Sequence, residues 1–194
     1  MVFGKNAWAI WVVGLPGSGK SSLVRGIADH LKAKGITVTI LAMDRRRKTY
    51  FPEPTYSARE REEAYALLAD EAASLVKQGE CVIIDGSAYR KAMRDRARCQ
   101  ISRFAEIYIY CDLEEAVRRE SLRPNGEVLA GLYHKALERK KTGQVWPGLG
   151  EVIGVDVPFE ENSDAELVID STRLSQEETL GKALHFLDSW LSDA

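Results

Sequence analysis

The sequence predicts an α/β fold in which a mostly parallel, five-stranded sheet carries helices on both faces and a lid at one end. Three observations predict it. Short apolar runs alternate with longer segments of helical periodicity, which is typical of a parallel sheet covered by helices. Helix-capping residues stand at several boundaries between these segments. The length of 194 residues, without internal repeats, fits one domain over residues 1–194.

The longest apolar run predicts a strand buried on both faces. It leads directly into a glycine-rich motif, so a strand is favoured over a secretory leader, which would need a cleavage site there. The other strands are expected where apolar, β-rich runs of four to seven residues recur. The five expected strands are Ala7–Val13, Thr37–Ala42, Cys81–Asp85, Glu106–Cys111 and Leu167–Ile169.

Six helices are expected between and after these strands. Ser57 with Glu60, and Ser175 with Glu178, have the spacing of capping boxes, and Gly35 stands where a helix should end. The expected helices are Lys20–Lys34, Ala58–Gln78, Arg90–Ser102, Glu114–Glu120, Leu132–Thr142 and Gln176–Leu191.

Composition excludes several functional classes. There are 27 Lys and Arg against 29 Asp and Glu, so the net charge is −2, which argues against a general nucleic-acid binder. The longest apolar run is far shorter than the ~20 residues of a membrane span. The three cysteines lack metal-ligand spacing and are expected to be thiols in a reducing cytoplasm.

Residues 119–161 interrupt the alternation of strands and helices. This stretch is rich in glycine, proline, lysine and arginine. An ordinary surface loop is one interpretation. A mobile lid is favoured, because long insertions within compact domains are uncommon unless they serve a function.

Gly14–Ser21 reads Gly-Leu-Pro-Gly-Ser-Gly-Lys-Ser and fits the phosphate-binding pattern G-x-x-x-x-G-K-[ST] (the P-loop) at every fixed position. It follows a predicted strand and opens a predicted helix, as the motif requires. Backbone N–H groups of such a loop surround phosphate oxygens, and the helix N-terminus adds positive potential. The pattern predicts a three-layer P-loop NTPase fold. The expected ATP-binding residues are Gly14, Gly17, Ser18, Gly19, Lys20, Ser21 and Ser22.

Two acids at predicted strand ends are candidates for chemistry. Asp85 ends an apolar strand like a Walker B acid, so Asp85 and the Ser21 hydroxyl are expected to hold Mg²⁺. Asp44 would face the ligand crevice of a parallel sheet and accept a proton from an attacking hydroxyl. A turn residue is the alternative for Asp85, and a helix N-cap or turn for Asp44. In the basic run Arg45–Lys48, at least one side chain is expected to contact an anionic substrate.

The nucleotide is expected to be ATP. A GTPase needs an Asn-Lys-x-Asp element to read guanine, and none occurs in the chain. A short chain with one P-loop, a short Walker B strand and a basic lid suits a small-molecule kinase.

Several further stretches resemble the adenylylsulfate (APS) kinases over nearly the whole chain. The most specific are Gly131-Leu-Tyr-His-Lys-Ala and Gly154-Val-Asp-Val-Pro-Phe-Glu160, together with Arg94-Asp-Arg-Ala-Arg. The resemblance implies an ATP- and Mg²⁺-dependent kinase that phosphorylates the ribose 3′-hydroxyl of APS, usually as a homodimer.

The resemblance also implies roles for single residues. Asp44 matches a likely base or Mg²⁺-side carboxylate, and Arg119 matches the arginine that opens the lid. With Lys20, these two are the expected catalytic residues. The expected substrate-binding residues are Arg47, Tyr56, Arg61 and Ser87. Of these, Tyr56 matches an aromatic that stacks on the APS adenine.

The chain departs from the family pattern mainly on the acceptor side. Ala64 replaces an asparagine, Ala66 an arginine, Ala130 the lid lysine and Val152 a second stacking phenylalanine. Trp146 is a candidate for the lost aromatic, with ordinary packing as the alternative. Further alternatives are therefore a related kinase for another nucleotide or phosphate-bearing metabolite, such as cytidine diphosphoramidate, or a catalytically weak ATP-binding module.

Overall fold

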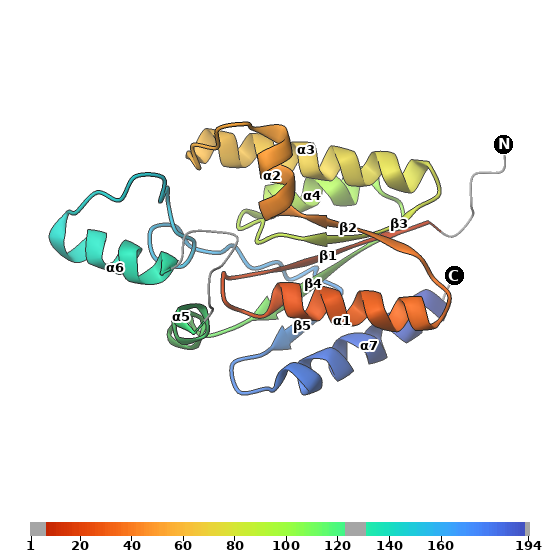
Figure 1. The fold of residues 1–194 in the computed structure, drawn as a ribbon. Coiled ribbons are helices and arrows are strands. Elements are labelled where there is room, and N and C mark those ends of the chain that lie inside the picture. The colour runs from red at the N-terminus through yellow and green to blue at the C-terminus, as the bar shows by residue number, and fades with distance from the viewer. Residues whose placement is uncertain (1–6, 123–130, 193–194) are drawn as a thin grey trace.

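The computed structural model describes residues 7–122 and 131–192. Its centre is a five-stranded sheet in which every neighbouring pair is parallel, with the order β2-β3-β1-β4-β5 (Figure 1). The predicted five-stranded α/β fold is thus confirmed. The strands are β1 (Ala9–Gly14), β2 (Val38–Ala42), β3 (Cys81–Asp85), β4 (Phe104–Tyr110) and β5 (Leu167–Asp170).

Helices cover both faces of this sheet. In Figure 1, α3 and α4 lie on one face, α1 and α7 lie on the other, and α5 and α6 stand at one end. The helices are α1 (Lys20–Ala33), α2 (Met43–Tyr50), α3 (Ala58–Lys77), α4 (Lys91–Gln100), α5 (Leu113–Ser121), α6 (Leu132–Thr142) and α7 (Gln176–Ser192).

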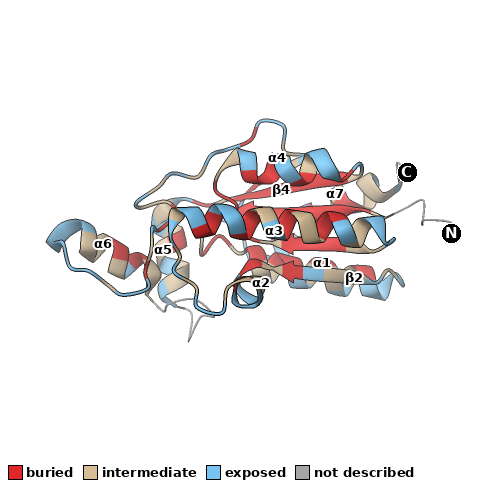
Figure 2. Ribbon diagram, turned by 90° about the horizontal axis from the view of Figure 1, so that it is seen from above, coloured by how far each residue is buried: buried red, intermediate tan, exposed pale blue. Residues whose placement is uncertain are grey.

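The central strand β1 separates two apolar cores. Trp11 and Val13 point toward α3 and α4, whereas Ile10 and Val12 point toward α1 and α7. All six residues of β1 are buried, which explains why its sequence is continuously apolar instead of alternating. The buried residues accordingly follow the sheet and the helix faces that meet it (Figure 2).

The capping chemistry is confirmed in full at one helix and in half at another. At α7, Ser175 Oγ accepts from the Glu178 N–H and Glu178 Oε2 accepts from the Ser175 N–H, which completes the box. At α3, Ser57 Oγ accepts from the Glu60 N–H, but the Glu60 carboxylate turns away to the N–H groups of Thr55 and Tyr56.

Helix α2 was not predicted. It begins directly after β2, so Asp44 lies in the first turn of a helix. The sequence predicts instead that Asp44 lies at the end of a strand. The segment lacks apolar periodicity because most of its residues are charged, and the sequence indicates only a basic run. Contacts with α3 stabilise it, among them the 2.6 Å ion pair between Arg46 and Glu71.

A buried ion pair ties α4 to the sheet. Arg94 Nε lies 3.0 Å from Glu106 Oε1, and neither side chain is exposed. The same guanidinium donates to the carbonyls of Ala88 and Glu160, and Asn162 donates to the other Glu106 oxygen. Arg94 therefore fixes the loop after β3 and the end of the predicted lid to one point in the core.

Part of the predicted lid packs with α5 and the residue after β4 in a third apolar cluster outside the sheet. Its buried members are Cys111, Ala116, Tyr133, Ala136, Leu149 and Val152. Residues 123–130 of the predicted lid, including Ala130, lie outside the described residues. Among the described residues, no helix is both long enough and apolar enough to cross a membrane.

Candidate active site

One pocket of about 1550 Å³ opens at the carboxyl ends of the central strands. Its first half, the P-loop half, is lined by residues 16–25 and by the chain after β5. Its second half, the α2/α3 half, is lined by Asp44, Arg47, Tyr56, Arg61 and Val152. Ligands of open parallel sheets bind at this end of the strands.

The P-loop has the backbone conformation that phosphate binding requires. Gly14, Gly17 and Gly19 have φ angles of 144°, 85° and 102°, which side chains rarely adopt. Gly17 also lies against α5, since a Cβ there would stand 2.3 Å from the Ala116 carbonyl oxygen. At Gly19 no heavy atom lies within 4 Å of a built Cβ, so the loop is open on the pocket side.

The N-terminus of α1 is suited to an anion. Its N-cap is Gly19, no side chain caps it, and its first turn contains no acidic residue. The Lys20 side chain is buried and its Nζ donates to the Leu15 carbonyl at 2.8 Å. Ser18 Oγ is buried and makes no hydrogen bond within the described chain. These groups fit the phosphates of a nucleotide.

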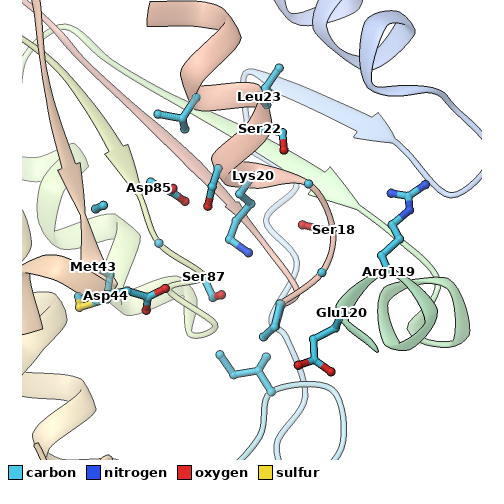
Figure 3. Close-up of a pocket in the computed structure, with 18 of the residues that line it drawn as sticks. Ser18, Lys20, Ser22, Leu23, Met43, Asp44, Asp85, Ser87, Arg119 and Glu120 are labelled. Atoms are coloured by element: carbon cyan, nitrogen blue, oxygen red, sulfur yellow. The ribbon is translucent and has the colours of Figure 1, made fainter. Parts of the chain in front are cut away.

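Strand register brings the acids to the same place. Ala42 pairs with Asp85, so the first turn of α2, with Asp44, begins beside the end of β3. Figure 3 shows Asp44, Asp85 and Ser87 on the pocket wall that faces Lys20. The Asp85 carboxylate and Ser21 hydroxyl are the hard oxygen donors that Mg²⁺ prefers, and a site with one or two carboxylates plus phosphates is usual for this ion. The residues present therefore fit Mg²⁺.

In the α2/α3 half, Arg47 is engaged by protein groups. Its Nη1 donates to Glu60 Oε1 at 2.7 Å, and its guanidinium lies 5.1 Å from the centre of the Tyr56 ring. Burial alone would raise the pKa of Glu60, but hydrogen bonds from Thr55 and Arg47 bring it below its ordinary value. Glu60 therefore stays ionised and holds the loop before α3 through Thr55 and Tyr56.

Arg61 is the other cation of this half. Its Nη2 donates to the Glu151 carbonyl at 2.6 Å and its guanidinium lies over the Tyr89 ring. Its Nη1 is buried without a hydrogen-bond partner in the described chain, although Arg61 lines the pocket. A guanidinium among the residues that line a pocket is suited to an anionic ligand.

Arg119 lies in the pocket but not beside Lys20. Its Nε donates to Glu115 at 2.7 Å, and Nη2 donates to the carbonyls of Ser171 and Thr172. Figure 3 shows its side chain directed away from the Lys20 ammonium. Hydrogen bonds from Arg118 and Arg119 lower the pKa of Glu115 to about 2, so this contact is ionic at neutral pH. Arg119 is thus engaged by protein groups in this structure, and its catalytic role remains a prediction.

The altered positions differ in what surrounds them. Val152 is buried and lines the pocket, so the position of the lost aromatic does face the site. Ala64 is buried in the apolar core beneath α3. Trp146 does not line the pocket: its ring faces Lys135, with the ammonium 5.6 Å from the ring centre. Of the two interpretations of Trp146, the structure favours ordinary packing, because the ring packs against the third apolar cluster.

Sequence reasoning missed two contacts that connect the lid region to the site. The Tyr133 hydroxyl donates to the Pro16 carbonyl of the P-loop at 2.9 Å, and Arg139 donates to the Gly150 carbonyl at 2.8 Å. Tyr133 belongs to the Gly131-Leu-Tyr stretch, so a signal for its importance was present, but its partner could not be read from spacing.

Comparisons with known proteins agree with this geometry. The adenylylsulphate kinase family model matches residues 6–170. A probable adenylyl-sulfate kinase of Pyrococcus abyssi is 31% identical over 173 residues, which cover 89% of this chain and 90% of the relative. An adenylyl-sulfate kinase of Geotalea uraniireducens is 31% identical over 192 residues, which cover 98% of this chain and 85% of the relative.

A solved structure shares the fold. The Mycobacterium tuberculosis APS kinase in complex with AMPPNP and APS superposes with a TM-score of 0.77 at 24% identity, and the match covers 94% of this chain and 98% of that one. The family match spans most of the chain and includes the P-loop, α2, α3 and the described part of the lid. The chain belongs to the adenylylsulphate kinase family of ATP-dependent phosphotransferases.

Proposed function

We propose that this protein transfers the γ-phosphoryl group of ATP to the 3′-hydroxyl of APS. The observation that carries the proposal is one continuous pocket that is lined by the P-loop, by the carboxylates of Asp44 and Asp85 and by Arg61. Family membership makes APS the leading acceptor. The α2/α3 half would then hold APS, and the P-loop half would hold ATP.

The proposed roles follow from the chemistry of each group. Lys20 and the N–H groups at the start of α1 would bind the β- and γ-phosphates. Asp44, which lies on the wall opposite Lys20 (Figure 3), would accept the proton of the attacking hydroxyl. Ser21 and Asp85 would hold Mg²⁺, which neutralises charge on the phosphates when bound. Arg61, which lines the pocket, would bind the anionic part of the acceptor.

Arg119 requires a change of contacts in this proposal. To neutralise the moving phosphoryl group it would exchange Glu115 and the carbonyls of residues 171 and 172 for phosphate oxygens. Where it stays on these groups, it would instead position the chain after β5, which lines the P-loop half. The substitution Arg119→Lys separates the two roles, because lysine keeps the charge but loses the multiple contacts.

The test is product identification by mass after incubation with ATP, Mg²⁺ and APS. The proposal expects 3′-phospho-APS and ADP in equal amounts, and no ADP without APS. Lys20→Ala should lower turnover by orders of magnitude, while Lys140→Ala on the exposed side of α6 should not change it. ATP binding without APS-dependent turnover would reject APS as acceptor. ADP formation that does not depend on any acceptor would indicate a hydrolase.

A second acceptor class is favoured by the walls of the α2/α3 half. Val152 stands where the family has an aromatic, and the Arg47 guanidinium covers one face of the Tyr56 ring. Loss of one aromatic partner would cost ~1–3 kcal/mol of base stacking. Another phosphate-bearing hydroxyl compound is therefore the runner-up, and it is tested by ADP release across a panel of such compounds.

The homodimer that family resemblance implies, the single-domain organisation and the cytoplasmic location remain predictions. Light scattering of the purified chain at micromolar concentration tests the first, and a mass near 43 kDa, twice the 21.7 kDa of one chain, is the expected result.

A further inference from the structure

Helix α6 contacts the P-loop near its N-terminal end. Tyr133 is fully buried, and its hydroxyl donates to the carbonyl oxygen of Pro16 at 2.9 Å. Pro16 is the third residue of the P-loop and lines the pocket. The phosphate-binding loop is therefore held from the outside by a side chain of the lid region.

The same helix contacts the opposite part of the pocket near its C-terminal end. Arg139 Nη2 donates to the Gly150 carbonyl at 2.8 Å and to Asp156 Oδ2 at 2.7 Å. That carboxylate oxygen also accepts from the Val152 N–H at 2.6 Å. Arg139 and Asp156 together therefore fix the short segment 150–152.

Segment 150–152 forms a wall of the α2/α3 half. A Cβ built on Gly150 would stand 2.6 Å from the Tyr56 carbonyl oxygen, so the two backbones are in close contact. The Glu151 carbonyl accepts from Arg61, and Val152 packs in one apolar cluster with Tyr133. A displacement of this segment would change the surroundings of both Tyr56 and Arg61.

We propose that α6 couples the two halves of the pocket, with Tyr133 and Arg139 as its positioning residues. A helix of eleven residues is stiff, so a shift imposed at one end is carried to the other. Nucleotide phosphates that order the P-loop would then order segment 150–152 through Pro16, Tyr133, Arg139 and Gly150. The assignment of the acceptor to that half rests on the proposed function, whereas the mechanical link does not.

The link has a parallel path through side-chain packing. A Cβ on Gly154 would stand 3.3 Å from the Leu15 side chain, so the P-loop also touches the lid region directly. Removal of one hydrogen bond on α6 should therefore weaken the coupling without abolishing the fold. Because Tyr133→Phe keeps the buried ring, it tests the hydroxyl alone.

The experiment is amide hydrogen exchange of residues 148–157, with and without AMPPNP and Mg²⁺. In the wild-type chain, AMPPNP should slow exchange in this segment at least about fivefold, the lower end of usual coupling between sites. Tyr133→Phe and Arg139→Met should each reduce this slowing by more than half. Arg139→Lys, which keeps one donor, should restore part of it. Lys140→Met, which removes a neighbouring exposed charge on the same helix, should leave it unchanged.

Binding and stability measurements separate coupling from a general loss of structure. Both variants should retain AMPPNP binding, and Tyr133→Phe should melt within about 3 °C of the wild type, as expected for loss of one net hydrogen bond. With an accepted substrate, Arg139→Met should raise the KM for the acceptor more than it lowers kcat. The proposal is overturned if AMPPNP does not slow exchange of residues 148–157 in the wild type, or if it slows exchange in the variants as much as in the wild type. If AMPPNP slows exchange as expected but no phosphoryl group is transferred to APS, only the proposed acceptor is rejected.

Discussion

The guanidinium of Arg47 and the carboxylate of Glu60 form a 2.7 Å ion pair beneath the α2/α3 half of the pocket, with 5% and 8% of the two side chains exposed. Glu60 also accepts from the N–H groups of Thr55 and Tyr56. An arginine expected to bind substrate is thus neutralised by the protein itself. Arg47 therefore helps to hold the loop that contains Tyr56, through Glu60, in addition to supplying positive charge.

Glu60→Gln should destabilise the protein at neutral pH by about 2 kcal/mol, because Arg47 is left buried without its counter-ion. For a chain of this length that is a fall in Tm of about 4–8 °C. Since the folded-state pKa of Glu60 is lowered, its stabilisation is present above the unfolded pKa of about 4.3 and is lost as pH falls through the folded value. The Tm difference between wild type and variant should therefore be constant from pH 8 to 5 and shrink below about pH 4.5. A difference that persists unchanged at pH 3 would contradict this account.

Two P-loop glycines should fail in different ways when substituted by alanine. Gly17→Ala adds a Cβ 2.3 Å from the Ala116 carbonyl of α5, so the loop and α5 must separate. Gly19→Ala meets nothing within 4 Å but projects beside the open face of the loop, and φ is unfavourable at both positions. We expect the larger fall in Tm for Gly17→Ala. For Gly19→Ala we expect the greater loss of AMPPNP affinity relative to its loss of stability. Calorimetry of unfolding and of AMPPNP binding on the same samples measures both, and equal effects of the two variants on stability would refute the contact argument.

Arg94→Met should cost about 3 kcal/mol, because it removes the nearer counter-ion of the buried Glu106 carboxylate and leaves it with Asn162 and with Arg98 at 3.9 Å. The double variant Arg94→Met/Glu106→Leu should recover much of that stability, because two apolar side chains leave neither buried charge of this ion pair in the core. Burial raises the pKa of Glu106 and lowers that of Arg94, so both charged forms are costly there. Urea unfolding of the two variants measures the difference.

Recovered stability should not bring recovered activity. Arg94 also donates to the carbonyls of Ala88 and Glu160, and Ala88 follows Ser87 in the pocket wall with a positive φ of 40°. The double variant should therefore keep a raised KM for the acceptor. A double variant that is as unstable as Arg94→Met alone would show that the carbonyl contacts, and not the ion pair, dominate.

The sequence predicts the parts of the site that follow from local rules. The P-loop is a fixed pattern of residue types, β1 is an unbroken apolar run, and the Ser175 capping box needs only residues three apart. Each of these depends on a few neighbouring residues, so no tertiary information is needed to find it.

The missed features depend on partners distant in the chain. Helix α2 is stabilised by Glu60 and Glu71 of α3, which compensate a segment with almost no apolar residues. Arg119 finds its carbonyl partners 52 and 53 residues away, and Tyr133 finds Pro16 at a separation of 117 residues. Spacing rules contain no information on such contacts, so the partners of these residues could not be predicted from the sequence.

The two pocket carboxylates should separate in a magnesium titration. Asp85→Asn removes a proposed Mg²⁺ ligand, so the Mg²⁺ concentration for half-maximal activity should rise about 10–100-fold, the usual cost of disturbing a metal site. Asp44→Asn removes the proposed proton acceptor, so kcat should fall about 10²–10⁴-fold with little change in the Mg²⁺ requirement. The geometry favours this division, because Asp85 ends β3 whereas Asp44 lies in the first turn of α2, near Ser87 (Figure 3). A raised Mg²⁺ requirement in Asp44→Asn, with normal kcat at saturating Mg²⁺, would assign Asp44 to the metal instead.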